Sequence, residues 1–180
     1  MKKELIETIE IPEGIEVNKE ENMIIIKGKL GENKKEFKFG KINFEKKDNK
    51  IIIQCKNATK AEKKIINTTV AHIKNMIKGV SEKFEYKLKI CFSHFPMTVK
   101  IENNKAKISN FLGEKISRIA NIPENAEVTI DRDIITINST DKEIAGQAAA
   151  NFETATKIRN RDRRVFQDGI FIINKAGKEI

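Results

Sequence analysis

The sequence of 180 residues has no tryptophan, one tyrosine, three prolines and two cysteines. The cysteines, Cys55 and Cys91, are too few for a disulfide framework, so we expect both to be buried, reduced side chains in a reducing cytoplasm. No run approaches the roughly 18 consecutive apolar residues that a membrane-spanning helix needs. No apolar segment follows the N-terminal Met-Lys-Lys-Glu, so we expect no secretion signal. These absences predict a cytoplasmic protein without a membrane partner.

Residues suited to catalysis or metal binding are also scarce. Asp131 and Asp133 offer the paired carboxylates that metal-dependent nucleases use, but they lie between two strand-like runs, where a polar turn is expected. Cys91 and His94 have the spacing of a zinc ligand pair, yet no second pair completes a tetrahedral site. No glycine-rich phosphate loop is present. We therefore predict no catalytic site, no metal and no cofactor, and keep the nuclease only as the enzymatic alternative.

The chain is strongly basic, with a net charge of +9 and a pI near 9.4. Such a charge favours a polyanionic partner, because lysines and arginines release the counterions of a phosphate backbone. Almost all the cations are lysine: only six residues are arginine, and four of these lie between Lys157 and Arg164. A planar guanidinium can bond two phosphate oxygens at once, which an ammonium group does poorly. The arginine run therefore indicates a nucleic-acid contact.

A plainer explanation of the run is a basic helix end that complements the helix dipole. One or two cations suffice for that, whereas this run holds four arginines and Lys157. If the segment is extended, Lys157, Arg159, Arg161 and Arg163 project to one side and form a ladder along a phosphate backbone. Proteins that read single strands stack bases on exposed aromatic residues, which are scarce here. We therefore expect recognition of a folded backbone by shape, although the residues alone do not separate RNA from DNA.

The hydrophobic pattern occurs twice. Each half contains short strand-like runs followed by one helical segment that opens on a capping box, Thr59–Glu62 in the first half and Thr140–Glu143 in the second. The two boxes lie 81 residues apart, and two further pairs, Pro12 with Pro96 and Gly31 with Gly113, are 84 and 82 apart. We predict the α+β class, with two similar domains, 1–80 and 81–180, that arose by internal duplication. Each domain would pack an antiparallel sheet on one helix.

The expected elements are as follows. In the first half we expect strands at Ile9–Ile11, Met23–Ile26, Phe37–Phe39, Ile42–Phe44 and Ile51–Ile53, with turns that include Gly31, and a helix that stops at Gly79. In the second half we expect strands at Phe84–Ile90, Met97–Ile101, Lys105–Ile108, Ala126–Ile130 and Ile134–Ile137, with a helix that ends near Ala155.

Only the second half continues past its helix, through the arginine run and Val165–Ile173. This addition points to the C-terminal domain as the one that binds. Within it, Asp168-Gly169 is a turn signal, and Gly169 would let the backbone approach a phosphate closely. The segment from Asn110 to Arg118 fits a loop, a short helix or a strand, and its Lys115 and Arg118 would add to a basic surface.

Several motifs together resemble the large-subunit ribosomal protein L6 family of archaeal and eukaryotic type. They are Asn75–Val80, Phe84–Ile90, Ser93–Met97, Asn110–Lys115, Ala145–Asn151, Thr156–Arg164 and Phe166–Phe171. The resemblance covers nearly the whole chain and is most specific between Asn75 and Phe171. It implies two similar α+β domains, which agrees with the duplication.

The resemblance also implies a structural role in the large ribosomal subunit. The partners would be 23S-type rRNA, bound chiefly by the C-terminal domain near the sarcin–ricin loop and the translation-factor site, and neighbouring ribosomal proteins, with the chain as a monomer within the cytoplasmic ribosome. The RNA-facing positions would be Gly146 and Gln147 at a helix start, Lys157, Arg159, Arg161, Arg163 and Arg164, and the turn at Asp168 and Gly169. The alternative is a free-standing basic regulator that binds nucleic acid, or a basic module that binds protein.

Overall fold

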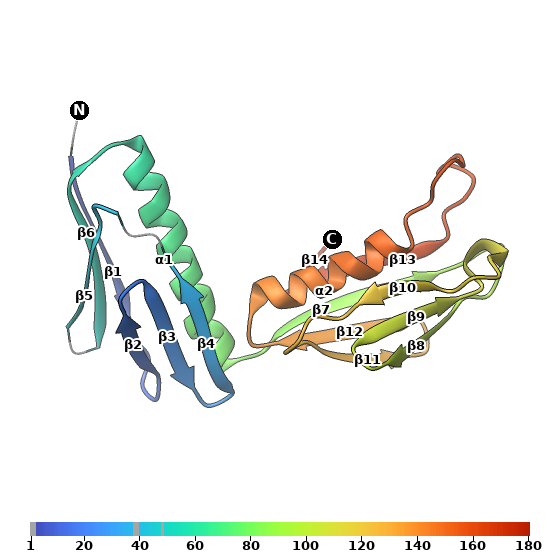
Figure 1. Cartoon of the computed structure of the whole chain (residues 1–180), viewed down its shortest axis with the longest axis horizontal. Helices are drawn as coiled ribbons and strands as arrows, with labels where there is room; N and C mark the ends of the chain where they lie inside the picture. Colours follow the sequence, from blue (N-terminus) through green and yellow to red (C-terminus); the bar gives the residue numbers. More distant parts are fainter. Residues whose placement is uncertain (1–2, 38–39, 48) are drawn as a thin grey trace. The chain divides into compact units, whose positions relative to one another are not determined.

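The structure is a computed structural model that describes residues 3–37, 40–47 and 49–180. The chain divides into two compact units, Met1–Lys83 and Phe84–Ile180, so the division falls between Lys83 and Phe84. Both units combine antiparallel strands with one long helix (Figure 1). The predicted α+β class and the repeated plan are confirmed. The structure adds that each unit divides its strands between two sheets.

The first unit holds two three-stranded antiparallel sheets and one helix. One sheet has the order β1-β6-β5 and the other β2-β3-β4. The strands are β1 (Lys3–Glu10), β2 (Glu16–Glu20), β3 (Met23–Gly28), β4 (Gly31–Glu36), β5 (Asn43–Lys47) and β6 (Lys50–Ala58). Helix α1 (Lys60–Ser81) packs against strands of both sheets, and its buried side chains, among them Ile66 and Ile73, close one core with Ile24, Ile26 and Ile53.

The capping box predicted for α1 is present. The Thr59 hydroxyl accepts a hydrogen bond from Ala61 N at 3.3 Å, and the Glu62 carboxylate accepts one from Thr59 N at 2.8 Å. The predicted stop at Gly79 is wrong, because the helix runs on to Ser81. Val80 is fully buried and its carbonyl accepts from Leu30 N at 3.2 Å. Packing on the end of β3 therefore outweighs the low helix propensity of glycine.

The apolar pattern of the sequence does not predict two polar strands of this unit, β2 and β4. β2 was missed, and β4 begins at Gly31, where a turn was expected. β4 reads Gly-Glu-Asn-Lys-Lys-Glu and lies at the edge of its sheet, where charged side chains face water. A search for alternating apolar residues cannot find such a strand. Of the predicted strand Phe37–Phe39, Phe37 follows β4, and residues 38–39 lie outside the described ranges.

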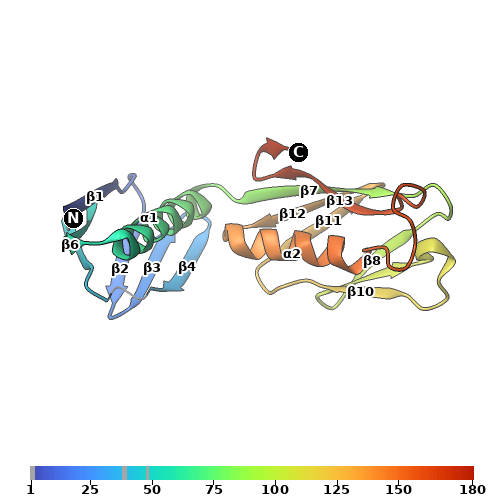
Figure 2. The same ribbon diagram turned by 90° about the horizontal axis from the view of Figure 1, so that it is seen from above.

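The second unit has a five-stranded sheet, β11-β12-β7-β13-β14, and a three-stranded sheet, β10-β9-β8. The strands are β7 (Phe84–Cys91), β8 (Thr98–Glu102), β9 (Lys105–Ser109), β10 (Arg118–Asn121), β11 (Glu127–Asp131), β12 (Ile134–Ser139), β13 (Gly169–Lys175) and β14 (Lys178–Glu179). A short 3-10 turn, Phe111–Gly113, precedes β10. Helix α2 (Lys142–Ala155) packs on β7, β12 and β13 and on β10 (Figure 2). Its Ala145, Ala148 and Phe152 are fully buried.

The start of α2 differs from the prediction. The N-cap is Asp141 rather than Thr140, and the Asp141 carboxylate accepts from Glu143 N at 2.8 Å. Since α2 begins at Lys142, Gly146 and Gln147 lie beyond its first four residues, so they offer no free N-terminal amides to an anion. The cause is Ser139 at the end of β12, whose buried hydroxyl accepts from Asp141 N and thereby fixes where the helix begins.

Gly28 supports a prediction about the first unit. A Cβ added at Gly28 would lie 2.7 Å from Val80 Cγ2 and 2.8 Å from Val80 Cβ, closer than real contacts allow. Gly28→Ala should therefore force α1 away from β3 and destabilise the unit by about 1–3 kcal/mol. Circular dichroism during thermal unfolding would measure this, with hydrogen exchange of the α1 amides assigning the loss to the first unit.

Gly146→Ala is the matched control for this prediction. A Cβ there would lie 3.5 Å from the Tyr86 hydroxyl, an ordinary contact, and alanine favours the helix interior. We expect this variant to be neutral or slightly more stable. Equal destabilisation by both substitutions would contradict the packing argument.

Candidate nucleic-acid interface

The arginines lie on one loop, residues 157–168, which we call the arginine loop. It joins the end of α2 to the start of β13 and projects beyond the helix (Figure 1, orange-red). Thr156, which is buried, connects its two ends: the Thr156 hydroxyl donates to Phe152 O at 3.2 Å and accepts from Ile170 N at 2.9 Å. The Thr156 side chain thus bonds both the last turn of α2 and the first residues of β13. The loop therefore leaves and re-enters the fold at one fixed point.

The arginine loop is not extended, so the predicted ladder of alternating cations is wrong. Asn160 adopts left-handed backbone with φ 57°, which reverses the chain direction. A turn follows, in which Phe166 N donates to Asp162 O at 2.9 Å and Arg164 N donates to the Asp162 carboxylate at 2.9 Å. Asparagine tolerates left-handed backbone, and aspartate caps turns with its side chain. The arginines therefore lie around a turn and not along one side of an extended segment.

The five cations of the loop, Lys157, Arg159, Arg161, Arg163 and Arg164, are all exposed. Arg164 has a weak partner, Asp162, at 3.4 Å, and the guanidinium of Arg161 lies 4.8 Å from the centre of the Phe166 ring. Within the described part of the chain, the side chains of Lys157, Arg159 and Arg163 form no hydrogen bond or ion pair. Their charges are thus available to a ligand.

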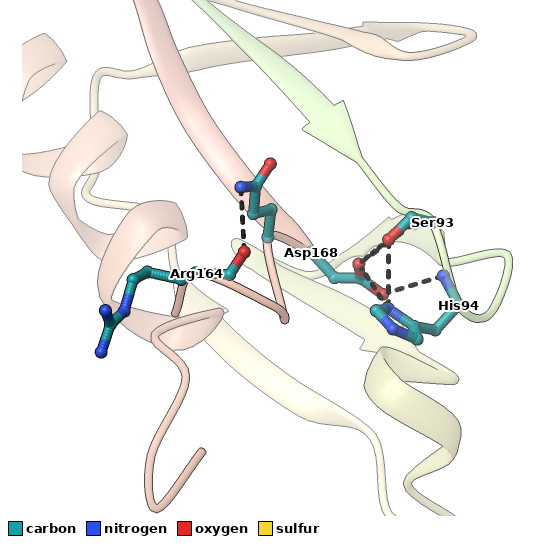
Figure 3. Close-up of polar contacts among 5 residues, drawn as sticks. Ser93, His94, Arg164 and Asp168 are labelled. Carbon is teal, nitrogen blue, oxygen red and sulfur yellow. Dashed lines mark hydrogen bonds and ion pairs between the residues drawn. The ribbon is translucent and has the colours of Figure 1, made fainter. Parts of the chain in front are cut away.

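Asp168 anchors the far end of the loop. Its side chain is only 2% exposed, and its carboxylate accepts from Ser93 Oγ at 2.8 Å, Ser93 N at 3.1 Å and His94 N at 3.3 Å, with His94 Nδ1 at 3.1 Å (Figure 3). Burial acts to raise the pKa of Asp168, but the hydrogen bonds from His94 and Ser93 outweigh it and leave the pKa below its ordinary value. The prediction that Asp168 faces RNA is therefore revised to a role in holding the loop.

A stack of side chains continues from this anchor to the loop surface. The His94 ring lies on the Phe166 ring with centroids 4.8 Å apart and planes at 25°, and the Arg161 guanidinium also lies against the Phe166 ring. Arg161 is therefore held in place by a cation–π contact. The side chain of Arg164, in contrast, points away from the Asp168 cluster into solvent (Figure 3).

Arg118, at the start of β10, clamps the near end of the loop. Its guanidinium donates to both Glu114 oxygens at 2.6 and 2.8 Å and to the carbonyls of Ala155 and Lys157 at 2.9 and 3.1 Å, and it lies 4.2 Å from the Phe111 ring centre. Hydrogen bonds from Arg118 lower the pKa of Glu114. The prediction that Arg118 adds to the basic surface is wrong, because the protein itself uses its donors. Lys115 is exposed beside it.

The remaining predicted positions have local roles. Gln147 is exposed and donates to Asn151 at 2.8 Å, and Gly146 is half-buried beside Tyr86. Gly169 is buried, so its backbone does not offer itself to a phosphate. Its missing Cβ instead makes room for the Phe171 ring, which would lie 3.0 Å from an added Cβ. RNA contact by Lys157, the loop arginines, Gln147 and Lys115 stays a prediction.

Ser93, His94 and Asp168 are the residue types of a hydrolase triad, but their arrangement differs. In a triad the serine and the aspartate bind opposite nitrogens of the imidazole. Here Ser93 Oγ and Asp168 Oδ1 both approach His94 Nδ1, each at 3.1 Å, and Ser93 Oγ also donates to Asp168. The hydroxyl therefore faces a structural acceptor and has no general base. The cluster fixes a loop rather than activating a nucleophile.

The structure also places the remaining residues that the sequence singled out. Asp131 and Asp133 flank a hairpin turn between β11 and β12 and are exposed. Among the residues that the structure describes, no group of three or more histidine, cysteine, aspartate or glutamate side chains could hold a metal ion. No described helix is long and apolar enough to cross a membrane. Cys55 is buried as predicted, whereas Cys91 is only half-buried, because the loop leaves a cavity over it.

Two sheet-and-helix units, of which the second carries an anchored cationic loop, define a duplicated α+β protein. The family model described as ribosomal protein L6 matches the chain twice, over residues 11–83 and 95–169, so each unit contains one match. The large ribosomal subunit protein uL6 of Methanobrevibacter smithii is 46% identical over 169 residues, covering 94% of this chain and 95% of that protein. The uL6 protein of Methanosarcina mazei is 42% identical over 176 residues, covering 98% and 100%. The chain belongs to the ribosomal protein L6 family.

The anchor at Asp168 predicts an acid-sensitive contribution to stability. The folded-state pKa lies below that of an unfolded aspartate, about 3.9. A lowered pKa gives stability that is fully present above the unfolded pKa and is lost as pH falls through the folded value. Asp168→Asn should lower the free energy of unfolding at pH 7 by about 1–3 kcal/mol. Because the variant has no carboxylate here to protonate, its free energy of unfolding should also fall less than that of the wild type below about pH 4.

Urea unfolding at a series of pH values would measure this difference between the two proteins. Asp162→Asn, at an exposed carboxylate of the same loop, is the control and should change little. A wild type and an Asp168→Asn variant with parallel pH profiles would contradict the anchoring role.

Proposed function

We propose that the chain is a structural, non-catalytic constituent of the large ribosomal subunit in the cytoplasm and that its C-terminal unit binds 23S-type rRNA through the arginine loop. Family membership supports the ribosomal role. The observation that carries the binding site is a pair of exposed guanidinium groups, Arg159 and Arg163, which have no hydrogen-bond or ion-pair partner among the described residues and lie on a loop fixed at both ends.

The fixed ends matter for affinity. A phosphate-binding side chain on a free loop loses conformational entropy when RNA orders it. Here Thr156, Asp168 and Arg118 hold the loop through hydrogen bonds before RNA arrives. The side chains of Lys157, Arg159 and Arg163 remain to be ordered, but the backbone that carries them is already in place. We propose phosphate contact by these three and by Arg164, with Lys115 and Gln147 at the margin.

We further propose that the site on the ribosome lies near the sarcin–ricin loop and the translation-factor site, with other large-subunit proteins as neighbours and translation factors nearby. The family resemblance of the Asn110–Lys115, Ala145–Asn151 and Thr156–Arg164 segments supports this placement. The chain would be a monomer within the particle. Chemical probing of the rRNA in subunits with and without the protein tests the placement: protections elsewhere would contradict it.

The loop arginines should determine how RNA binding depends on salt. Replacing Arg159 or Arg163 with Gln should weaken binding to a large-subunit rRNA transcript and reduce the log–log salt slope by roughly 0.7–0.9 for each phosphate that the variant no longer neutralises. Filter binding between about 50 and 200 mM salt would measure the slope. Arg132→Gln is the control for each of the two single replacements, because it removes one arginine charge from an exposed hairpin turn outside the loop. A slope that changes equally in the control would contradict phosphate contact by the loop.

Co-sedimentation separates the ribosomal role from that of a free-standing regulator. A constituent of the subunit should stay with large subunits through a salt wash, because many phosphate contacts must break together. A regulator should return to the unbound fraction. The proposal would be contradicted if most of the wild-type protein were recovered in the unbound fraction and the arginine variants behaved in the same way.

A further inference from the structure

A cavity of about 690 Å³ lies beneath the arginine loop, between the end of α2, the loop and the start of β13. Its wall is largely apolar and includes Cys91, Ile158 and Phe171. Phe171 is 42% exposed although it is a large aromatic side chain on a strand. The volume lies in the range of about 300–1,000 Å³ that is usual for small-ligand pockets. The cavity is therefore large enough for one flat, nucleotide-sized group.

Two aromatic rings of the described residues line the cavity, Phe166 and Phe171, and of these Phe171 is the one open to a ligand. Phe166 also borders it, but His94 and Arg161 already lie on that ring. Phe171 has contact with the backbone of Gly169, where the lack of a Cβ brings the ring close to the strand, and the rest of the ring opens into the cavity. A flat group could therefore stack on Phe171 without displacing any described contact.

Charges on the lining indicate how such a group would be oriented. Lys157 and Arg163 border the cavity, and their side chains form no ion pair among the described residues, so they suit a phosphate at the mouth. Glu153 also lines it and would repel a phosphate placed inside, but its carboxylate can accept from an exocyclic amine of a base. The Gln167 side-chain amide donates to Arg164 O at 3.3 Å, and its carbonyl oxygen can accept from a base. The lining thus fits a base inside and a phosphate outside.

We propose that this cavity receives one unpaired nucleotide of the rRNA, with its base stacked on Phe171 and its phosphate held by Lys157 and Arg163. The inference rests on the proposed function, since it names the part of the rRNA that the same site takes. It adds a base contact to a surface whose other contacts go to the backbone. Bases in RNA loops and bulges are unstacked and are commonly read by aromatic side chains in this way.

Phe171→Leu tests the stacking contact in the full-length chain. The substitution keeps an apolar side chain on the sheet but removes the flat ring, so affinity for a large-subunit rRNA transcript should fall roughly tenfold. The salt slope should stay unchanged, because the cations that neutralise phosphate are all still present. Phe95→Leu is the matched control: Phe95 is 48% exposed, lies outside the cavity lining and should leave affinity unchanged.

Ultraviolet crosslinking of the bound wild-type protein supplies a second measurement. Bases that touch a side chain crosslink to it directly, so mass spectrometry should find one nucleotide attached at Phe171 or Cys91. Equal affinity of Phe171→Leu and Phe95→Leu would overturn the inference while leaving the proposed function intact. Crosslinks confined to residues 157–165 would support that outcome. Failure of the wild type to bind rRNA at all would instead overturn the proposed function.

Discussion

The burial of one carboxylate, Asp168, is the constraint on which the cationic loop depends. Four arginines and a lysine within eight residues repel one another, and an unanchored segment of this kind would stay extended in solvent. Asp168 draws the end of the loop against Ser93 and His94, which lie 75 and 74 residues earlier in the chain. A buried carboxylate is costly unless its oxygens are bonded, and here four donors approach them. The surface for which we propose RNA contact thus depends on a residue that is itself buried.

The same arrangement divides the arginines of the second unit by task. Arg118 serves the fold, because its fork links β10 to the carbonyls at the start of the loop. Arg161 makes a cation–π contact with Phe166, and Arg164 forms a weak ion pair with Asp162. The guanidinium groups of Arg159 and Arg163 have no hydrogen-bond or ion-pair partner in the part of the chain that the structure describes. The arginines of this unit therefore include side chains that support the fold and side chains that are open to a ligand, so the number of arginines in a segment locates the loop without separating the two kinds.

The periodicity of the apolar residues predicted much of the fold because burial follows it directly. The predicted strand Phe84–Ile90 alternates buried residues with exposed or half-buried ones, and the Thr59–Glu62 box starts α1. Polar edge strands such as β4 gave no apolar signal. At the site, the arginine cluster was visible as composition, but the roles of Ser93, His94 and Thr156 were not. Their partners are distant in sequence or, as with Ile170, lie across a loop whose path is set by backbone turns at Asn160 and Asp162.

The bridge that Thr156 makes to Ile170 has a consequence for how such a loop changes over time. The Thr156 hydroxyl bonds both the end of α2 and the start of β13. The two ends of the loop are therefore held together, and this link does not depend on how many residues lie between them. The entropy cost of closing a loop rises only slowly with the number of residues in it. Residues can therefore be inserted or exchanged between the two anchors at little cost to the packed core. The length and sequence of the loop are therefore freer to change than those of the helix and the strands that hold it.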